Sequence, residues 1–214
     1  QVAYSFNASL TVPDLSDYNL MNAEEKLQAE LLSGLYDLST ANGMTAYVMK
    51  KNYITKGVDT DWMSQPLQNQ FNHSHSLYIS GGTEGFRFGT DLSYNHEGGV
   101  MKKSYRNRMS VGIYVDYRVG KLQIRNNVSY DLARSSDSPY GSFSDYTKQQ
   151  PYYPIYDDNG KLLQMLAIGI PNPLYEATLG NFSRGESSNL TNNLSFYWFI
   201  NCLLYTSPSP RDCS

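Results

Sequence analysis

Two pairs of side chains have the types and spacing that a metal site or acid–base chemistry would use. Asp59 and Asp61 flank one threonine, and His73 and His75 are two residues apart, on the same face of a strand. No third oxygen ligand follows the aspartates at the spacing of a calcium loop, and no further ligand converges on the histidines. We therefore expect capping or turn hydrogen bonds from the aspartates, no metal, and an interfacial histidine pair at the outer end of a strand.

Nucleophilic catalysis would need a serine beside a base that is itself oriented by a third group. Ser142 and Ser144 lie next to Asp145, but no histidine is close to them in the sequence, because all three histidines lie between positions 73 and 96. We therefore predict no catalytic residue and no cofactor, and we predict that the protein is not an enzyme.

Polar side chains also recur at every second position through the middle of the chain. In Phe86–Asn95, Met109–Arg118 and Leu122–Leu132, apolar residues alternate with polar and often charged ones. Successive side chains of a strand point to opposite faces, so each run predicts a strand with one apolar and one polar face. The charged residues on the polar faces, which we expect to face a hydrated lumen, are Arg87, Asp91, Asp116, Arg118, Arg125 and Asp131.

The connections between these runs alternate between short and long. Ser80–Gly85 and Val119–Lys121 are tight turns with glycine, which tolerates positive φ, whereas His96–Arg106 is longer and charged. Pro13–Asn72 and Arg134–Glu186 are longer still, and the strand directions place all three long connections on one side. This sorting is typical of an outer-membrane barrel, and runs of about ten residues suit tilted strands in a bilayer.

Three further strands complete the predicted sheet. Val2–Val12 and Leu190–Ile200 alternate like the central runs, and His75–Ser80 is the second strand along the chain. We predict an all-β fold, an antiparallel meander of about six strands that is open and curved, because six strands are fewer than the smallest barrels use.

One short helix is predicted inside the first long connection. Asn22 followed by Glu25 is close to a capping box, and the residues after it place an apolar stripe on one helix face. The stripe consists of Ala23, Leu27, Leu31 and Leu35. From Tyr36 to Phe71 the chain is polar, and we expect it to be irregular.

Composition narrows the possible classes of protein. Charged residues make up only 17% and the formal net charge is −3, which excludes a nucleic-acid-binding footprint. No run of eighteen apolar residues is present, so we expect no transmembrane helix. Gln1 opens directly in a strand pattern without a signal peptide, so we expect the chain to be truncated at its N-terminus.

The last residues differ from the rest in composition. Residues 202–214 hold both cysteines in a Ser/Pro-rich tail, and Cys202–Asp212 resembles the translation of a common sequencing adapter. We therefore treat residues 1–201 as the native part and 202–214 as adapter read-through, outside the fold. Without this tail, neither a disulfide framework nor a thiolate metal site is possible.

The long connections are rich in aromatic residues. Long loops without regular structure are usually functional, and Tyr, Trp and Phe suit stacking on sugar rings or peptide side chains. For most of these residues individually, the alternative is that the ring only pins the loop in place. The candidate contact residues are Trp62, Tyr140, Phe143, Tyr146, Tyr152, Tyr153, Tyr156 and Tyr175.

Several longer motifs carry a specific resemblance. They cover residues 1–201 in order and resemble the SusC/RagA family of TonB-dependent outer-membrane transporters. The motifs are Pro13–Leu27, Gly57–Trp62, Tyr78–Gly82, Leu92–Val100, Ser138–Tyr146 and Asn172–Leu174.

The resemblance implies a 22-stranded barrel in the outer membrane of a Gram-negative bacterium, in contact with lipid and filled by an N-terminal plug. It further implies import of glycans or peptides, a SusD-like surface lipoprotein as partner, and energy from the TonB complex. The present chain would be the start of the barrel after the plug. Because the plug is missing, no binding residue of the family is carried over to this sequence.

Two other classes of protein fit parts of the pattern. A secreted carbohydrate-binding β-sandwich would use the same tyrosines without a membrane. An outer-membrane hydrolase would need a catalytic triad assembled in space, because no histidine neighbours Ser142 or Ser144 in the sequence. A sandwich would cover the apolar face with a second sheet, whereas a barrel would leave that face to lipid. The residues that distinguish the two are Phe86, Leu92, Val111, Ile113, Val128 and Phe196.

Overall fold

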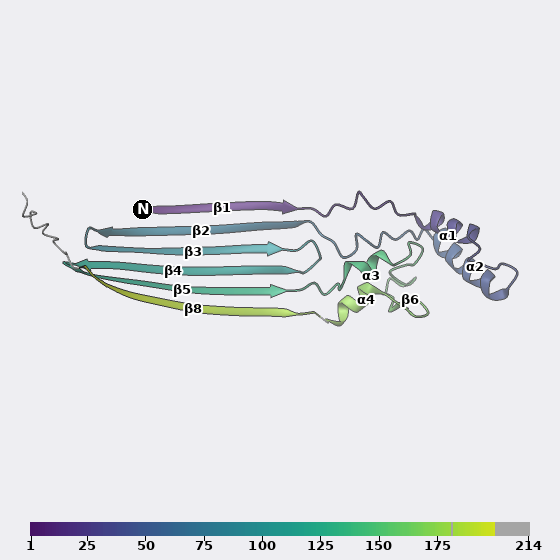
Figure 1. Ribbon diagram of the computed structural model, residues 1–214. Helices are drawn as coiled ribbons and strands as arrows, with labels where there is room; N and C mark the ends of the chain where they lie inside the picture. Colours follow the sequence, from purple (N-terminus) through teal and green to yellow (C-terminus); the bar gives the residue numbers. More distant parts are fainter. Residues whose placement is uncertain (181, 200–214) are drawn as a thin grey trace, which may run out of the picture.

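The computed structural model describes residues 1–180 and 182–199, and its largest element is one six-stranded antiparallel sheet (Figure 1). The strands pair in the order β1-β2-β3-β4-β5-β8, so the sheet is a meander that stays open between β1 and β8. This confirms the fold class predicted from the sequence. The strands are β1 (Val2–Thr11), β2 (Gln70–Thr83), β3 (Phe86–Gly98), β4 (Tyr105–Val119), β5 (Leu122–Ser136) and β8 (Arg184–Trp198).

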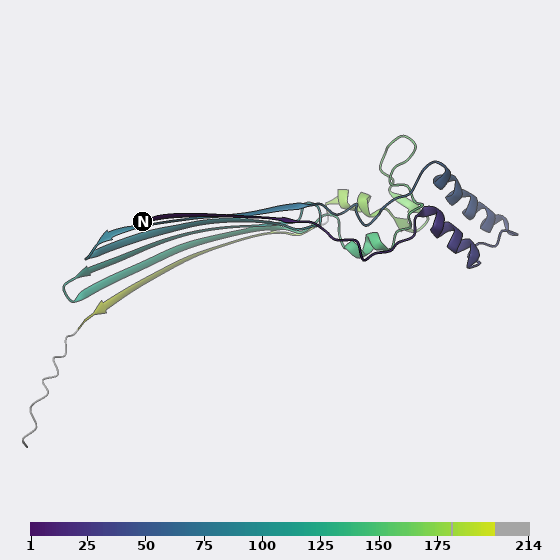
Figure 2. The ribbon, with the colours of Figure 1, turned by 90° about the horizontal axis from the view of Figure 1, so that it is seen from above.

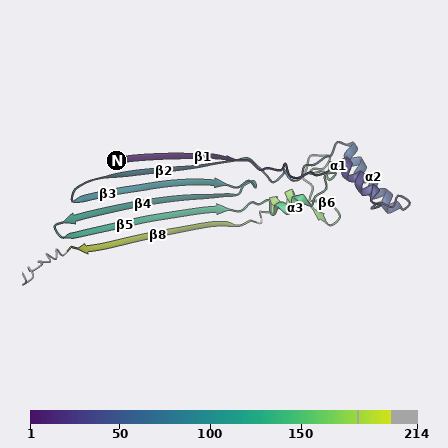
Figure 3. The same cartoon turned by 45° about the horizontal axis from the view of Figure 1, so that its top comes forward.

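All remaining elements lie beyond one end of the sheet, and the tight turns lie at the other end (Figures 1 and 3). None of the helices in the described residues is long and apolar enough to cross a membrane. Residues 202–214, assigned to adapter read-through, lie outside the described residues. The elements beyond the sheet are α1 (Ala23–Leu32), α2 (Ala41–Thr55), α3 (Phe143–Thr147), β6 (Met165–Ala167), β7 (Ile170–Pro171), α4 (Pro173–Glu176) and the 3-10 helix η1 (Ala177–Leu179).

The sheet is a single curved layer, as the view in Figure 2 shows. The apolar side chains remain open along its length: Ile113 is 51% exposed and Phe196 is 64% exposed. No element of residues 1–180 and 182–199 covers either face, whereas a sandwich would have buried these side chains under a second sheet.

The strand register places the alternating residues on two distinct faces. Ile113 lies opposite Thr90 on one side and Val128 on the other, and all three belong to the predicted apolar face. Asp116 lies between Arg87 and Arg125 on the polar face. A shift of one residue in any strand would exchange its faces, so the pattern of period two fixes this register.

The first long connection contains two helices, of which the sequence predicted one. α1 begins as expected: the Asn22 side chain accepts a hydrogen bond from the Glu25 N–H at 2.8 Å, and the Glu25 carboxylate accepts from the Asn22 N–H at 3.1 Å. The expectation of irregular chain from Tyr36 to Phe71 is wrong over α2. This helix has no buried residue and carries Gly43 in its first turn, so it shows neither a clear apolar stripe nor high propensity.

Candidate functional site

The two long connections pack together around a small aromatic core. Trp62 from the first connection and Tyr146, Tyr152 and Tyr153 from the second are all at most 5% exposed. The Trp62 indole N–H donates to the Gln150 carbonyl at 3.0 Å, as buried indoles require. The loops therefore form one packed unit above the end of the sheet.

A buried carboxylate joins this core to both helices. Glu30 of α1 accepts hydrogen bonds from the hydroxyls of Tyr36 and Tyr152, the latter at 3.0 Å. The Lys50 ammonium of α2 lies 3.6 Å from Glu30 and 4.6 Å from the centre of the Tyr152 ring. Burial, and then the nearby Glu30 carboxylate, raise the pKa of Tyr36 and of Tyr152 above the ordinary range, so both hydroxyls remain protonated donors.

Asn172 has a structural role that the sequence analysis missed. Its side chain is fully buried, and its amide donates to the Leu163 carbonyl at 2.8 Å while its oxygen accepts from the Leu174 N–H at 3.0 Å. It thereby caps α4 and fixes the chain around β6. The signal in the sequence was the Asn before Pro173, an N-cap followed by proline in the first helical turn.

The eight aromatic candidates divide into two equal groups. Four are the buried rings of the aromatic core. These rings hold the loops together, which is the alternative to a binding role that the sequence left open. The other four keep exposed surface: Tyr156 is 55% exposed, and Tyr140, Phe143 and Tyr175 are partly exposed. Contact with a partner or substrate stays a prediction for all eight residues. Only the four that keep exposed surface have ring area that a partner or substrate could contact.

An open groove of about 610 Å³ lies between the two connections. It combines ring faces, amides and carboxylates, which are the groups that bind sugars and peptides. Asp59 is already occupied there, because it accepts from the Ala23 N–H at 2.9 Å, and Asp61 accepts from the Ser64 N–H at 3.3 Å, as expected for capping and turn residues. The groove is lined by residues 15, 18–22, 26, 59–63, 146, 147 and 149–151.

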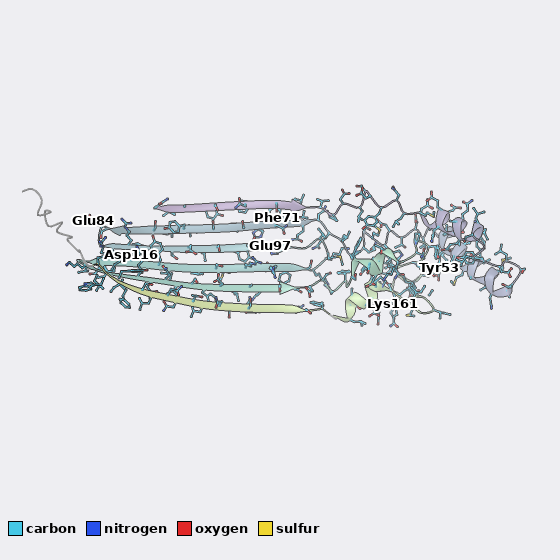
Figure 4. All side chains as sticks on the ribbon, viewed as in Figure 1. Tyr53, Phe71, Glu84, Glu97, Asp116 and Lys161 are labelled. Carbon is cyan, nitrogen blue, oxygen red and sulfur yellow. The ribbon has the colours of Figure 1, made fainter. Side chains whose placement is uncertain are left out.

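The polar face of the sheet brings the six predicted luminal charges together on one side. Arg125 donates to Asp116 at 2.9 Å, and Gln123 donates to the same carboxylate at 2.7 Å. Asp131 accepts from the Ser110 hydroxyl at 2.6 Å. Asp116 lies towards the tight turns, at the end opposite to the loops (Figure 4). Whether this face borders a lumen stays a prediction.

Glycines opposite large side chains shape the polar face, which the alternation alone does not reveal. Tyr114 on β4 lies directly across from Gly89 on β3, and a Cβ at Gly89 would be 2.2 Å from the Tyr114 ring. The hydroxyls of Tyr78 and Tyr114 are 3.3 Å apart. The Tyr114 ring thus lies over the backbone of Gly89, with its hydroxyl next to that of Tyr78.

The histidines lie at the loop end of β2 and β3, where the pair was expected. Their ring centroids are 5.2 Å apart for His73 and His75 and 5.3 Å for His73 and His96, so the pair is in fact a group of three. Among residues 1–180 and 182–199, no group of three or more His, Cys, Asp or Glu side chains has the geometry to hold a metal ion.

Comparison with solved structures identifies a similar fold. The structure of the RagAB peptide transporter matches with a TM-score of 0.66 at 16% sequence identity, over 92% of this chain and 26% of that chain. The chain therefore corresponds to about a quarter of a much longer transporter chain. No family model and no curated protein sequence matches it. At this identity the likeness establishes the fold.

Proposed function

We propose that this chain is part of an outer-membrane transporter of the SusC/RagA kind, which imports oligosaccharides or peptides. The observation that carries the proposal is the single curved, open sheet with one apolar and one polar face and all long loops at one end. A soluble protein would leave the apolar face in water, which is costly. The likeness to part of a peptide transporter supports the same function.

The mechanism assigns a different task to each face. The apolar face contacts lipid, and closure of the barrel by further strands satisfies the open edges of β1 and β8. The polar face lines the lumen, where the Arg125–Asp116 pair and its neighbours hydrate the path and contact the plug. No bond is made or broken, so no catalytic group is needed.

The packed loops receive substrate on the outside. A SusD-like surface lipoprotein covers them, and the exposed rings of Tyr140, Phe143, Tyr156 and Tyr175 give contact area at low entropic cost. The buried rings and the Glu30 cluster keep that surface in one shape. Energy comes from the TonB complex through the plug, which precedes the barrel in this family.

Surface labelling of intact cells tests this orientation in the full-length protein. An epitope tag between Asn159 and Gly160, in a turn of the second long connection, should be reached from outside. A tag between Thr83 and Glu84, in a tight turn, should stay hidden until the outer membrane is opened. The reverse pattern, or a protein recovered in the soluble fraction, would contradict the proposal.

A binding measurement tests whether the exposed rings contact the lipoprotein or the substrate. Tyr156→Ala in the full-length protein should weaken capture of the lipoprotein or of labelled substrate by about 1–2 kcal/mol, the ordinary cost of truncating a contact tyrosine. Asp158→Ala, two residues away in an exposed ion pair with Lys56, is the matched control and should change binding little.

A further inference from the structure

All three histidines of the protein gather on the apolar face of the sheet, at its loop end. His73 on β2 lies directly opposite His96 on β3, and His75 lies on the same face two residues along β2. The rings of His73 and His96 are stacked, with centroids 5.3 Å apart. Three imidazoles on a largely apolar face need a physical reason, because polar groups facing lipid are unfavourable.

His73 and His96 belong to one polar cross-strand row, and His75 belongs to the next. The next row towards the tight turns is largely apolar, with Phe6, His75, Tyr94, Met109 and Leu132 in register. Beyond it the apolar face continues as far as Phe86 and Phe196. From β1 to β8, the polar row consists of Ala8, His73, His96, Asn107, Arg134 and Glu186.

The length of the strands places this row at the edge of a bilayer. Phe86 and His96 are ten positions apart on β3. At about 3.3 Å per residue they are separated by ~33 Å along the strand. A strand tilted by roughly 40° reduces that to ~25 Å along the membrane normal, which is the height of the apolar band of a barrel. The row therefore lies at the level where lipid headgroups begin, on the side of the long loops.

The rings have no negative partner within the described residues. His75 Nδ1 pairs with the Tyr4 hydroxyl at 2.8 Å, and the buried Nδ1 of His73 has no hydrogen-bond partner. His96 Nδ1 pairs with the Asn107 amide oxygen at 2.6 Å, and its Nε2 lies 3.4 Å from the side-chain nitrogen of Gln70. Tyr94 is the other titratable group facing them, with its ring 6.0 Å from that of His73. The charges at the far end of the row, on Arg134 and Glu186, are already paired with each other at 3.1 Å.

We propose that these three histidines bind the phosphate of a lipid headgroup in the outer leaflet. A phosphate oxygen accepts hydrogen bonds from the imidazole N–H groups and supplies the counter-charge that the sheet lacks. Phe6, which lies opposite His75 one row closer to the tight turns, contacts the upper part of the acyl chains. The inference rests on the proposed membrane location.

Lipid retention by the purified full-length transporter tests the site. Detergent-solubilised protein is mixed with dimyristoyl phosphatidic acid or with dimyristoylglycerol, which differ only in the phosphate, and bound lipid is counted by native mass spectrometry. The wild type should retain phosphatidic acid at least about tenfold more strongly than dimyristoylglycerol, a difference the size of one charge-assisted hydrogen bond.

The His73→Gln/His96→Gln double variant should lose this preference for phosphatidic acid. The matched control is Ser74→Gln/Asn95→Gln, the directly opposed pair on the other face of the same strands, which should behave as wild type. Equal retention of both lipids, or unchanged retention in the histidine variant, would overturn the lipid site. If inorganic phosphate displaced bound phosphatidic acid as effectively as added phosphatidic acid does, the histidines would form a site for free phosphate and the lipid site would be overturned. Failure of the surface labelling above would overturn the membrane location itself.

Discussion

At the scale of single residues, the charge of Glu30 is stabilised by groups from three separate segments. Its side chain is 11% exposed, and burying a carboxylate is costly unless it has charge-assisted partners. Lys50 supplies the nearest positive charge, and Tyr36 and Tyr152 supply two donors whose raised pKa keeps them protonated. This cluster makes the packing of α1, α2 and the second long connection interdependent.

Lys50→Met should loosen the loops selectively. It leaves Glu30 without its nearest buried counter-charge, and breaking a buried pair from one side costs about 3 kcal/mol. The backbone amides of α1 should therefore exchange with solvent about a hundredfold faster. Lys51→Met, the exposed next residue of α2, should leave this exchange unchanged. Equal effects of the two variants would mean that Lys50 acts through general helix stability.

At the scale of elements, Gly43 shows how packing reverses a propensity rule. Glycine inside a helix usually weakens it by about 1 kcal/mol relative to alanine. In α2, however, a Cβ at Gly43 would be 2.1 Å from the Asp37 carbonyl oxygen, which also accepts from the Thr40 hydroxyl at 2.8 Å. The glycine lets the turn before α2 fold against the first turn of the helix.

Gly43→Ala should consequently destabilise α2 instead of stabilising it. The backbone of Asp37 cannot rotate away as a side chain could, so we expect a loss of about 1–3 kcal/mol. Asn42→Ala, one residue earlier and exposed, should stabilise the helix by up to about 0.7 kcal/mol. Proteolysis rates within the Ala41–Thr55 segment of the folded protein would measure both. Stabilisation by Gly43→Ala would contradict the close approach.

The elements differ in how far the sequence predicts them, and the reason is the range of the interactions. The sequence predicts the strands from the alternation of apolar and polar residues, the tight turns from their glycines, and α1 from its capping box. These elements could be predicted because each signal spans only a few residues. The burial of Trp62 depends on Gln150 and Tyr153, about ninety positions along the chain, so no local pattern separates it from the exposed Tyr156. α2 was missed for a similar reason: its stabilising contacts, such as Lys50 with Tyr152, lie outside the helix.

At the scale of the whole molecule, the sheet and the loops differ in where their buried side chains lie. The sheet has almost no core of its own, since its apolar face is open and β1 is exposed along its whole length. The loops, by contrast, hold most of the fully buried side chains. The packed loop unit therefore keeps its shape by internal contacts, whereas in the proposed barrel the sheet depends on lipid and on further strands.

Matched charge substitutions on the two faces test this division in the full-length protein. Ile113 lies midway along the apolar face and Ser129 lies on the polar face of the neighbouring strand. Ile113→Lys should lower the stability of the protein in lipid vesicles by about 2–4 kcal/mol, because an ammonium at mid-depth in a bilayer is poorly solvated. Ser129→Lys should cost little, since a hydrated lumen accepts charge. The measurement is urea unfolding in vesicles, followed by the heat-dependent electrophoretic mobility of the folded barrel. Equal losses would place both faces in similar surroundings, as in a buried sandwich, and a larger loss for Ser129→Lys would invert the assignment of the faces.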